Sequence, residues 1–119
     1  MTNKEIIFEK YCEFFAICCN PVSCPGLLRV KNWLAAKGEL PSLYMIRRVS
    51  RELVADGLIE RDGFGWREPD WETPKYCSGY VLTKKGKETD TYKRIVIDVG
   101  KAFDEMWKKE EEKLLKEGW

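Results

Sequence analysis

Apolar residues recur at helical spacing in four stretches of this chain and at strand-like density in two shorter ones. The clearest helical pattern spans residues 41–60, where a projection at about 100° per residue separates two faces. One face collects Leu43, Ile46, Val49, Ser50, Leu53 and Val54, and the opposite face collects Tyr44, Arg47, Arg48 and Arg51. A globular helix buries one face and turns the other to water, so we expect three guanidiniums and a phenol at the surface.

The ends of this helix are marked by residues suited to cap it. Ser42 follows Pro41 and offers a side-chain oxygen to the first free backbone N–H groups. Asp56-Gly57 supplies the stop, because glycine tolerates the left-handed conformation that ends many helices. We therefore predict a helix over residues 42–56 that carries an arginine-rich outer face.

Three further stretches follow the same helical rule. Residues 4–19 carry an apolar stripe centred on Ile7, Tyr11 and Phe14, and residues 25–37 bury Leu27, Val30 and Leu34. The last stretch, residues 89–117, would form a helix roughly 40 Å long. Its stripe comprises Tyr92, Ile95, Val96, Val99, Phe103, Met106, Trp107 and Leu114.

The two apolar runs of strand type lie between these helices, at about residues 58–62 and 76–83. A hairpin joining them is the only sheet that the pattern predicts. Upstream of it, Lys37-Gly38 ends the second helix and a short turn leads into residues 42–56, which is the spacing of a helix-turn-helix. The expected fold is mainly α with a small β-hairpin (α+β), built as one domain over residues 1–119.

Several motifs of residues 25–90 resemble those of winged helix-turn-helix regulators. Leucine and tyrosine occur together at Leu43-Tyr44, GLIERD follows the arginine-rich helix, and KYCSGYVLTKKGKE ends in the turn Leu82-Thr83-Lys84-Lys85-Gly86. This pattern is similar to PadR-like regulators and, as a second choice, to MarR-like ones. The resemblance implies a helix-turn-helix and wing over residues 25–83, with the helix at 42–56 entering the major groove of DNA. It also implies a dimer formed through the terminal helices.

The charge of the expected wing departs from that family pattern. The stretch from Asp62 to Tyr76 contains four acidic and two basic residues. Its net charge is therefore negative, which is the wrong sign for a loop lying along DNA phosphates. Arg67 remains able to reach a minor groove. Alternatively Trp66 and Trp71 fold back on the body or line a hydrophobic site, because large aromatic side chains tend to find cover.

Positive charge returns after the wing at Lys84, Lys85 and Lys87. With Ser42, these lysines are candidates to hold the DNA backbone beside Tyr44, Arg47, Arg48 and Arg51. Lysine-rich turns are equally often ordinary solvated surface, so this alternative stays open.

The apolar stripe of the last helix is longer than its own domain is expected to cover, and the stripe of residues 4–19 is unusually wide. We therefore predict a homodimer, since apolar faces of this size favour a partner. The expected interface comprises Ile7, Tyr11, Phe14, Val99, Phe103, Met106, Trp107 and Leu114.

Composition limits the chemistry. The 119 residues carry a net charge of +1 and no histidine, so the commonest general base is missing, and no phosphate-binding glycine loop or nucleophile motif is present. The five cysteines lack the spacing of a zinc site, and we interpret them as buried thiols rather than ligands. We expect no enzyme activity, no cofactor and no metal. The lack of a long apolar run and of a signal-like start predicts a cytoplasmic location.

These observations together predict a dimeric, sequence-specific DNA-binding regulator that reads an inverted repeat. One alternative is a regulator that senses a small aromatic effector through its tryptophans. Another is a winged helix that binds proteins instead of DNA, which the near-zero net charge and the acidic wing favour.

Overall fold

The computed structural model describes residues 2–18, 20–29, 38–66 and 75–117. In these ranges the chain is mainly helical with one two-stranded antiparallel sheet, so the predicted class is confirmed. The elements run in the order α1 (Asn3–Ile17), α2 (Cys24–Arg29), α3 (Leu43–Ala55), β1 (Ile59–Trp66), β2 (Lys75–Leu82), α4 (Lys84–Lys87) and α5 (Asp90–Lys116).

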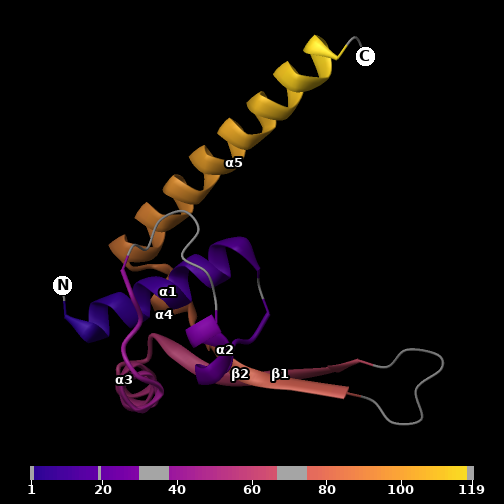
Figure 1. The fold of residues 1–119 in the computed structure, drawn as a ribbon. Coiled ribbons are helices and arrows are strands. Elements are labelled where there is room, and N and C mark those ends of the chain that lie inside the picture. The colour runs from indigo at the N-terminus through magenta and orange to yellow at the C-terminus, as the bar shows by residue number, and fades with distance from the viewer. Residues whose placement is uncertain (1, 19, 30–37, 67–74, 118–119) are drawn as a thin grey trace.

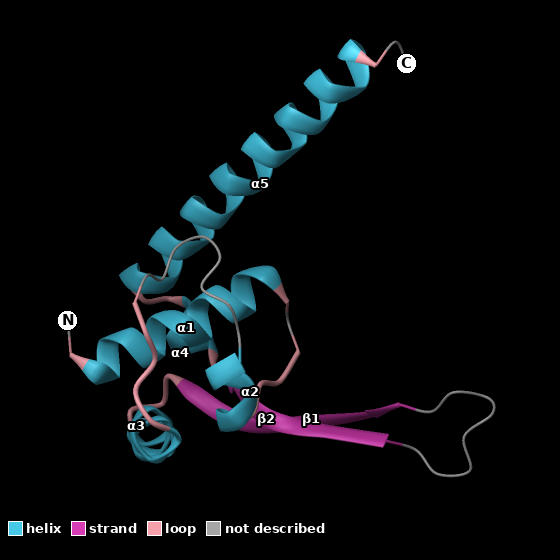
Figure 2. Cartoon of the chain, in the orientation of Figure 1, coloured by secondary structure: helices cyan, strands magenta, loops and turns pink. Residues whose placement is uncertain are grey.

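Helix α1 lies across the middle of the molecule. It contacts α3 and β2 on one side and α5 on the other, as Figures 1 and 2 show. The core forms around it and includes Ile46 and Leu53 of α3, Ile59 and Leu82 of the hairpin, and Ile95 of α5. Beyond this core α5 continues away from the body, which gives the molecule extents of 53 × 46 × 27 Å.

Part of the predicted dimer interface is wrong, because two of its residues on α1 are buried within the chain's own core. Ile7 and Tyr11 are 0% exposed because the chain's own α3, β2 and α5 cover α1, so neither side chain has surface left for a partner. Phe14 is half-buried against the same core. The helix also ends sooner than predicted, since Cys18 is its C-cap.

Charged groups are buried on α1 as well. Glu9 is 6% exposed and accepts a hydrogen bond from Arg94 of α5, with 2.6 Å between Arg94 Nη2 and Glu9 Oε1. Lys10 and Glu13 are also buried. The Glu9 carboxylate is buried whereas the Arg94 side chain is 54% exposed, so the pair links the core side of α1 to the solvent-exposed side of α5. Loss of Arg94 would leave the buried Glu9 carboxylate without its partner.

Helix α3 follows its sequence prediction closely. Ser42 Oγ accepts from the backbone N–H of Met45, Asp56 is the C-cap, and Gly57 has a φ of 76°. The predicted apolar face is buried at Ile46, Val49, Ser50 and Leu53. Two residues at the margin of that face differ, because Val54 is exposed and Leu43 is half-buried.

The hairpin is longer than predicted. β1 and β2 pair in register from Ile59 with Leu82 to Trp66 with Lys75, so only residues 67–74 connect them, and these lie outside the described residues. The possible roles of Arg67 and Trp71 therefore fall outside the description as well. β2 gains a second neighbour at its other edge, where Val22 and Tyr80 exchange two backbone hydrogen bonds of 3.2 and 2.9 Å.

Helices α4 and α5 begin at threonine caps. Thr83 Oγ1 accepts from the N–H of Gly86 to start α4, a single turn that the sequence did not predict, and Thr89 Oγ1 accepts from Tyr92 to start α5. The predicted helix over 89–117 is confirmed as Asp90–Lys116. For the helix predicted over 25–37, the described part α2 agrees and Leu27 is buried, whereas Val30 and Leu34 are outside the described residues.

Gly79 is required where the segment before α2 crosses β2. Gly79 is buried, and an added Cβ would overlap the Val22 carbonyl group and lie 2.7 Å from the backbone N of Ser23. The close approach of these backbones permits the Val22–Tyr80 pairing that places the start of α2 against the hairpin.

We expect Gly79→Ala to lower the free energy of unfolding by about 1–3 kcal/mol, because the methyl group forces two backbones apart. Urea unfolding followed by circular dichroism measures the effect. Ser78→Ala is the control, because Ser78 is the exposed neighbour of Gly79 in the same strand. Its substitution should change the free energy of unfolding by no more than about 0.5 kcal/mol. Equal urea midpoints for the two variants would show that the crossing tolerates a side chain.

Candidate functional site

The outer face of α3 carries exposed polar side chains on the body of the molecule. Tyr44 is 73% exposed, and Arg47, Arg48 and Arg51 are exposed along the same face. The buried residues Ile46, Val49 and Leu53 fix the helix from behind, so the outer side chains project from a rigid base. The structure thus brings together the four residues of α3 that the sequence singled out.

The arginines of α3 differ in their surroundings. Arg48 lies 3.9 Å from the carboxylate of Glu52 one turn later, and both side chains are largely exposed. An exposed pair of this kind contributes little to stability, so Arg48 remains available to a ligand. Arg47 and Arg51 have no ion-pair partner among the residues that the structure describes.

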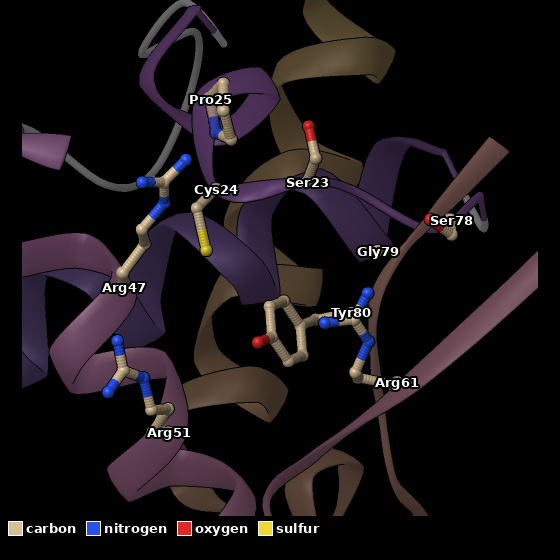
Figure 3. Close-up of a pocket in the computed structure, with 9 residues that line it drawn as sticks. All are labelled: Ser23, Cys24, Pro25, Arg47, Arg51, Arg61, Ser78, Gly79 and Tyr80. Atoms are coloured by element: carbon tan, nitrogen blue, oxygen red, sulfur yellow. The ribbon is translucent and has the colours of Figure 1, made fainter. Parts of the chain in front are cut away.

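Arg47 and Arg51 also border a pocket of about 350 Å³ between α3, the hairpin and the start of α2. Figure 3 shows the two α3 arginines on one side of the pocket and Arg61 with Tyr80 on the other. The lining residues are Ser23, Cys24, Pro25, Arg47, Arg51, Arg61, Ser78, Gly79 and Tyr80. Three of these nine residues carry guanidiniums and none carries a carboxylate.

Arg61 is held in the pocket by its pairing with Tyr80. The two residues are directly opposite in the ladder, and the guanidinium carbon lies 5.6 Å from the centroid of the tyrosine ring. Both backbone groups of Tyr80 bond to Val22, so Arg61 and Tyr80 form the non-hydrogen-bonded type of pair, in which side chains approach closely. The cation–π contact orients the guanidinium without neutralising its charge.

Sequence reasoning missed Arg61, Ser78 and Tyr80 as site residues. A signal was present, because strand side chains alternate and Arg61 is two residues after the buried Ile59. That spacing places Arg61 on the inward face of the hairpin, toward α3. Its partner Tyr80 depends on the strand register, which the sequence alone did not predict.

A buried polar network lies behind the pocket. Tyr11 Oη and Ser50 Oγ are 2.7 Å apart, and the thiol of Cys24 donates to Ser50 Oγ at 3.6 Å. The ring of Tyr11 also meets the ring of Tyr80 edge-on, with centroids 6.2 Å apart. Through these contacts α1 supports both sides of the pocket, α3 through Ser50 and the hairpin through Tyr80.

The basic residues after the hairpin have a different placement. Lys85 donates from Nζ to the backbone carbonyl of Asp56 at 2.8 Å, so it caps the C-terminal end of α3 rather than extending freely to a ligand. Lys84 and Lys87 are exposed on the same turn. Ser42 Oγ is engaged as the N-cap of α3, and Arg67 is outside the described residues.

The free end of α5 exposes the rest of the predicted interface. Met106 is 51% exposed, Trp107 69% and Leu114 45%, whereas Val99 is buried by the chain's own core and Phe103 is half-buried. Phe103, Met106 and Trp107 border a hollow of about 300 Å³ together with Glu110. Phe103, Met106, Trp107 and Leu114 thus leave an apolar stripe partly open to solvent on the free end of α5.

Two kinds of site are not found in the described part of the chain. None of its helices has the length and apolar content needed to cross a lipid bilayer. Its cysteine, aspartate and glutamate side chains do not gather in groups of three that could hold a metal ion. Cys12 and Cys24 are buried free thiols, which agrees with the interpretation of the cysteines as buried thiols, whereas the free thiol Cys18 is half-buried.

Comparison with protein-family models, with curated proteins and with solved structures finds no match to this chain. The interpretation of the site therefore depends on its geometry and charge.

Burial raises the pKa of the Tyr11 hydroxyl above its ordinary value of 10.0 and that of the Cys12 thiol above 9.0, with desolvation as the main cause in both. At high pH the folded state keeps these two protons, whereas the unfolded chain releases them. The contribution of the two groups to the free energy of unfolding is therefore complete below about pH 9 and declines above it. We expect the urea midpoint to fall above about pH 9, and to fall less steeply in Tyr11→Phe. Tyr44→Phe changes an exposed tyrosine and is the control, so its urea midpoint should depend on pH as that of the wild type does. If the midpoint of Tyr11→Phe fell as steeply with pH as in these two proteins, burial of the Tyr11 hydroxyl would not be a cause of the decline.

Proposed function

We propose that this protein is a sequence-specific regulator that binds double-stranded DNA as a dimer through a winged helix-turn-helix. The observation that carries the proposal is the outer face of α3, where Tyr44, Arg47, Arg48 and Arg51 are exposed on a helix fixed by the core. Arginine forks match the guanine edge and the phosphate group, and a helix fits the major groove.

The order of the elements supports the same proposal. A recognition helix of this class follows a shorter helix and precedes a β-hairpin wing, and α2, α3, β1 and β2 have that order. Val22 adds a third strand position at the edge of β2, so the segment before α2 is joined to the hairpin. With this arrangement α3 and the hairpin approach DNA as one rigid unit.

The exposed end of α5 supports a dimer. Val99, Ile7 and Tyr11 belong to the core of one protomer, so the proposed interface narrows to Phe103, Met106, Trp107 and Leu114, with Phe14 at its margin. Burial of that stripe is favourable by about 25 cal/mol per Å² of apolar surface. Two copies of α3 related by a two-fold axis would read half-sites about one helical turn apart.

We expect Arg48→Ala and Arg51→Ala each to weaken binding to a selected DNA site by about 1–3 kcal/mol, because each removes an arginine contact to a base edge or a phosphate. Fluorescence anisotropy at fixed ionic strength measures the affinity. Lys101→Ala is the control, since Lys101 is an exposed basic residue on α5 and its loss should leave affinity unchanged.

Wild-type affinity in both arginine variants, with circular dichroism showing a folded chain, would mean that α3 does not read DNA. An absence of salt-dependent binding to any duplex would instead favour the protein-binding alternative.

For the dimer, we expect Trp107→Glu to convert the protein to monomers at micromolar concentration, because a carboxylate replaces the most exposed apolar side chain at the centre of the stripe. Sedimentation velocity distinguishes the two states. Lys108→Gln makes the same change in charge on the opposite side of α5 and should remain dimeric. A wild-type chain that sediments as a monomer would refute the dimer.

A further inference from the structure

The pocket between α3, the hairpin and the start of α2 concentrates positive charge without a counter-ion. Arg47, Arg51 and Arg61 border it from two different elements, and no carboxylate is among its lining residues. None of the three has an ion-pair partner among the residues that the structure describes. Like charges gathered in this way repel, so a bound anion would lower the free energy of the site.

The lining favours one type of anion. Small-molecule sites are mostly apolar and span roughly 300–1,000 Å³, whereas this pocket of about 350 Å³ is lined largely by polar groups. Ser78 adds an exposed hydroxyl to the lining, which can donate to an oxygen anion. The hydroxyl of Ser23 points away from the guanidiniums in Figure 3 and accepts a hydrogen bond from the N–H of Gly26 at 3.0 Å. Several guanidinium forks with a hydroxyl donor suit a tetrahedral anion with three or four acceptor oxygens, which is the geometry of a phosphate group.

The contacts of Arg61 favour a preorganised site over a chance gathering of surface arginines. The Arg61 guanidinium is oriented by the ring of Tyr80, and that ring is itself held by Tyr11 in the core. Less side-chain freedom is then lost when an anion binds, so a preorganised arginine gains more affinity than a mobile one.

We propose that this pocket, bounded by Arg47, Arg51 and Arg61, is a phosphate-binding site. The phosphate comes from one of two sources, the DNA backbone beside α3 or a free phosphate compound. The first source rests on the proposed function, because it needs DNA on the outer face of α3; the second does not. Since Arg47 and Arg51 belong to both surfaces, a free phosphate compound in the pocket would compete with DNA.

The first arm of the test titrates inorganic pyrophosphate into the full-length protein by calorimetry in a low-chloride buffer. The expected result is saturable binding that Arg61→Gln weakens by about tenfold or more, the loss of one charge-assisted hydrogen bond. Arg61→Lys should recover only part of the affinity, because lysine keeps the charge but not the fork. Arg48→Gln is the matched control, since Arg48 lies on the same helix outside the pocket and should bind as the wild type does.

The second arm measures DNA affinity against salt concentration. A backbone phosphate in the pocket predicts that Arg61→Gln reduces the slope of log K against log salt by about 1. Pyrophosphate binding with an unchanged slope would support the site and assign it to a free phosphate compound. A chain that binds pyrophosphate but no DNA would refute the proposed function and leave the pocket standing.

Two results would overturn the proposal. One is the absence of pyrophosphate binding together with an unchanged salt slope in Arg61→Gln. The other is equal weakening of pyrophosphate binding in Arg61→Gln and Arg48→Gln, which would indicate a diffuse attraction to the whole basic face. Arg61 is exposed, so the variants are expected to fold, and circular dichroism verifies this.

Discussion

Burial of α1 is the constraint on which the rest of the structure depends. α3, β2 and α5 all pack on this one helix, and its side chains are covered on several sides, charged residues included. Tyr11 reaches both Ser50 of α3 and Tyr80 of the hairpin, while Glu9 holds Arg94 of α5. A change in the position of α1 would therefore move the arginine face, the hairpin and the long helix together.

This arrangement separates two surfaces of different chemistry. The first is the basic surface formed by α3 and the inward side of the hairpin, where Arg47, Arg51 and Arg61 border one pocket. The second is the apolar end of α5, beyond the reach of the domain's own core. A net charge of only +1 for the whole chain does not reveal the first surface, because the positive charge is concentrated at a pocket whose lining holds no carboxylate. Local clustering rather than total charge sets the attraction for an anionic partner.

Much of this organisation was predictable from local sequence rules. Ser42, Gly57 and the spacing of Ile46, Val49 and Leu53 were enough to place α3 and its outer face, because caps and helical periodicity act within one element. The prediction that Ile7 and Tyr11 lie at a dimer interface is wrong, because both are buried within one chain. A wide apolar stripe in a sequence does not indicate whether the residues that cover it belong to the same chain or to a partner. The role of Arg61 depends on strand register and on the Val22–Tyr80 pairing, which join residues far apart in sequence.

Mapping of amide chemical-shift changes by NMR, with a short DNA duplex added at low salt, tests the central claim most directly. We expect changes concentrated on residues 42–55 and around Arg61 and Tyr80, with the end of α5 unaffected by DNA. Changes confined to α5, or no changes at any DNA concentration, would contradict that claim.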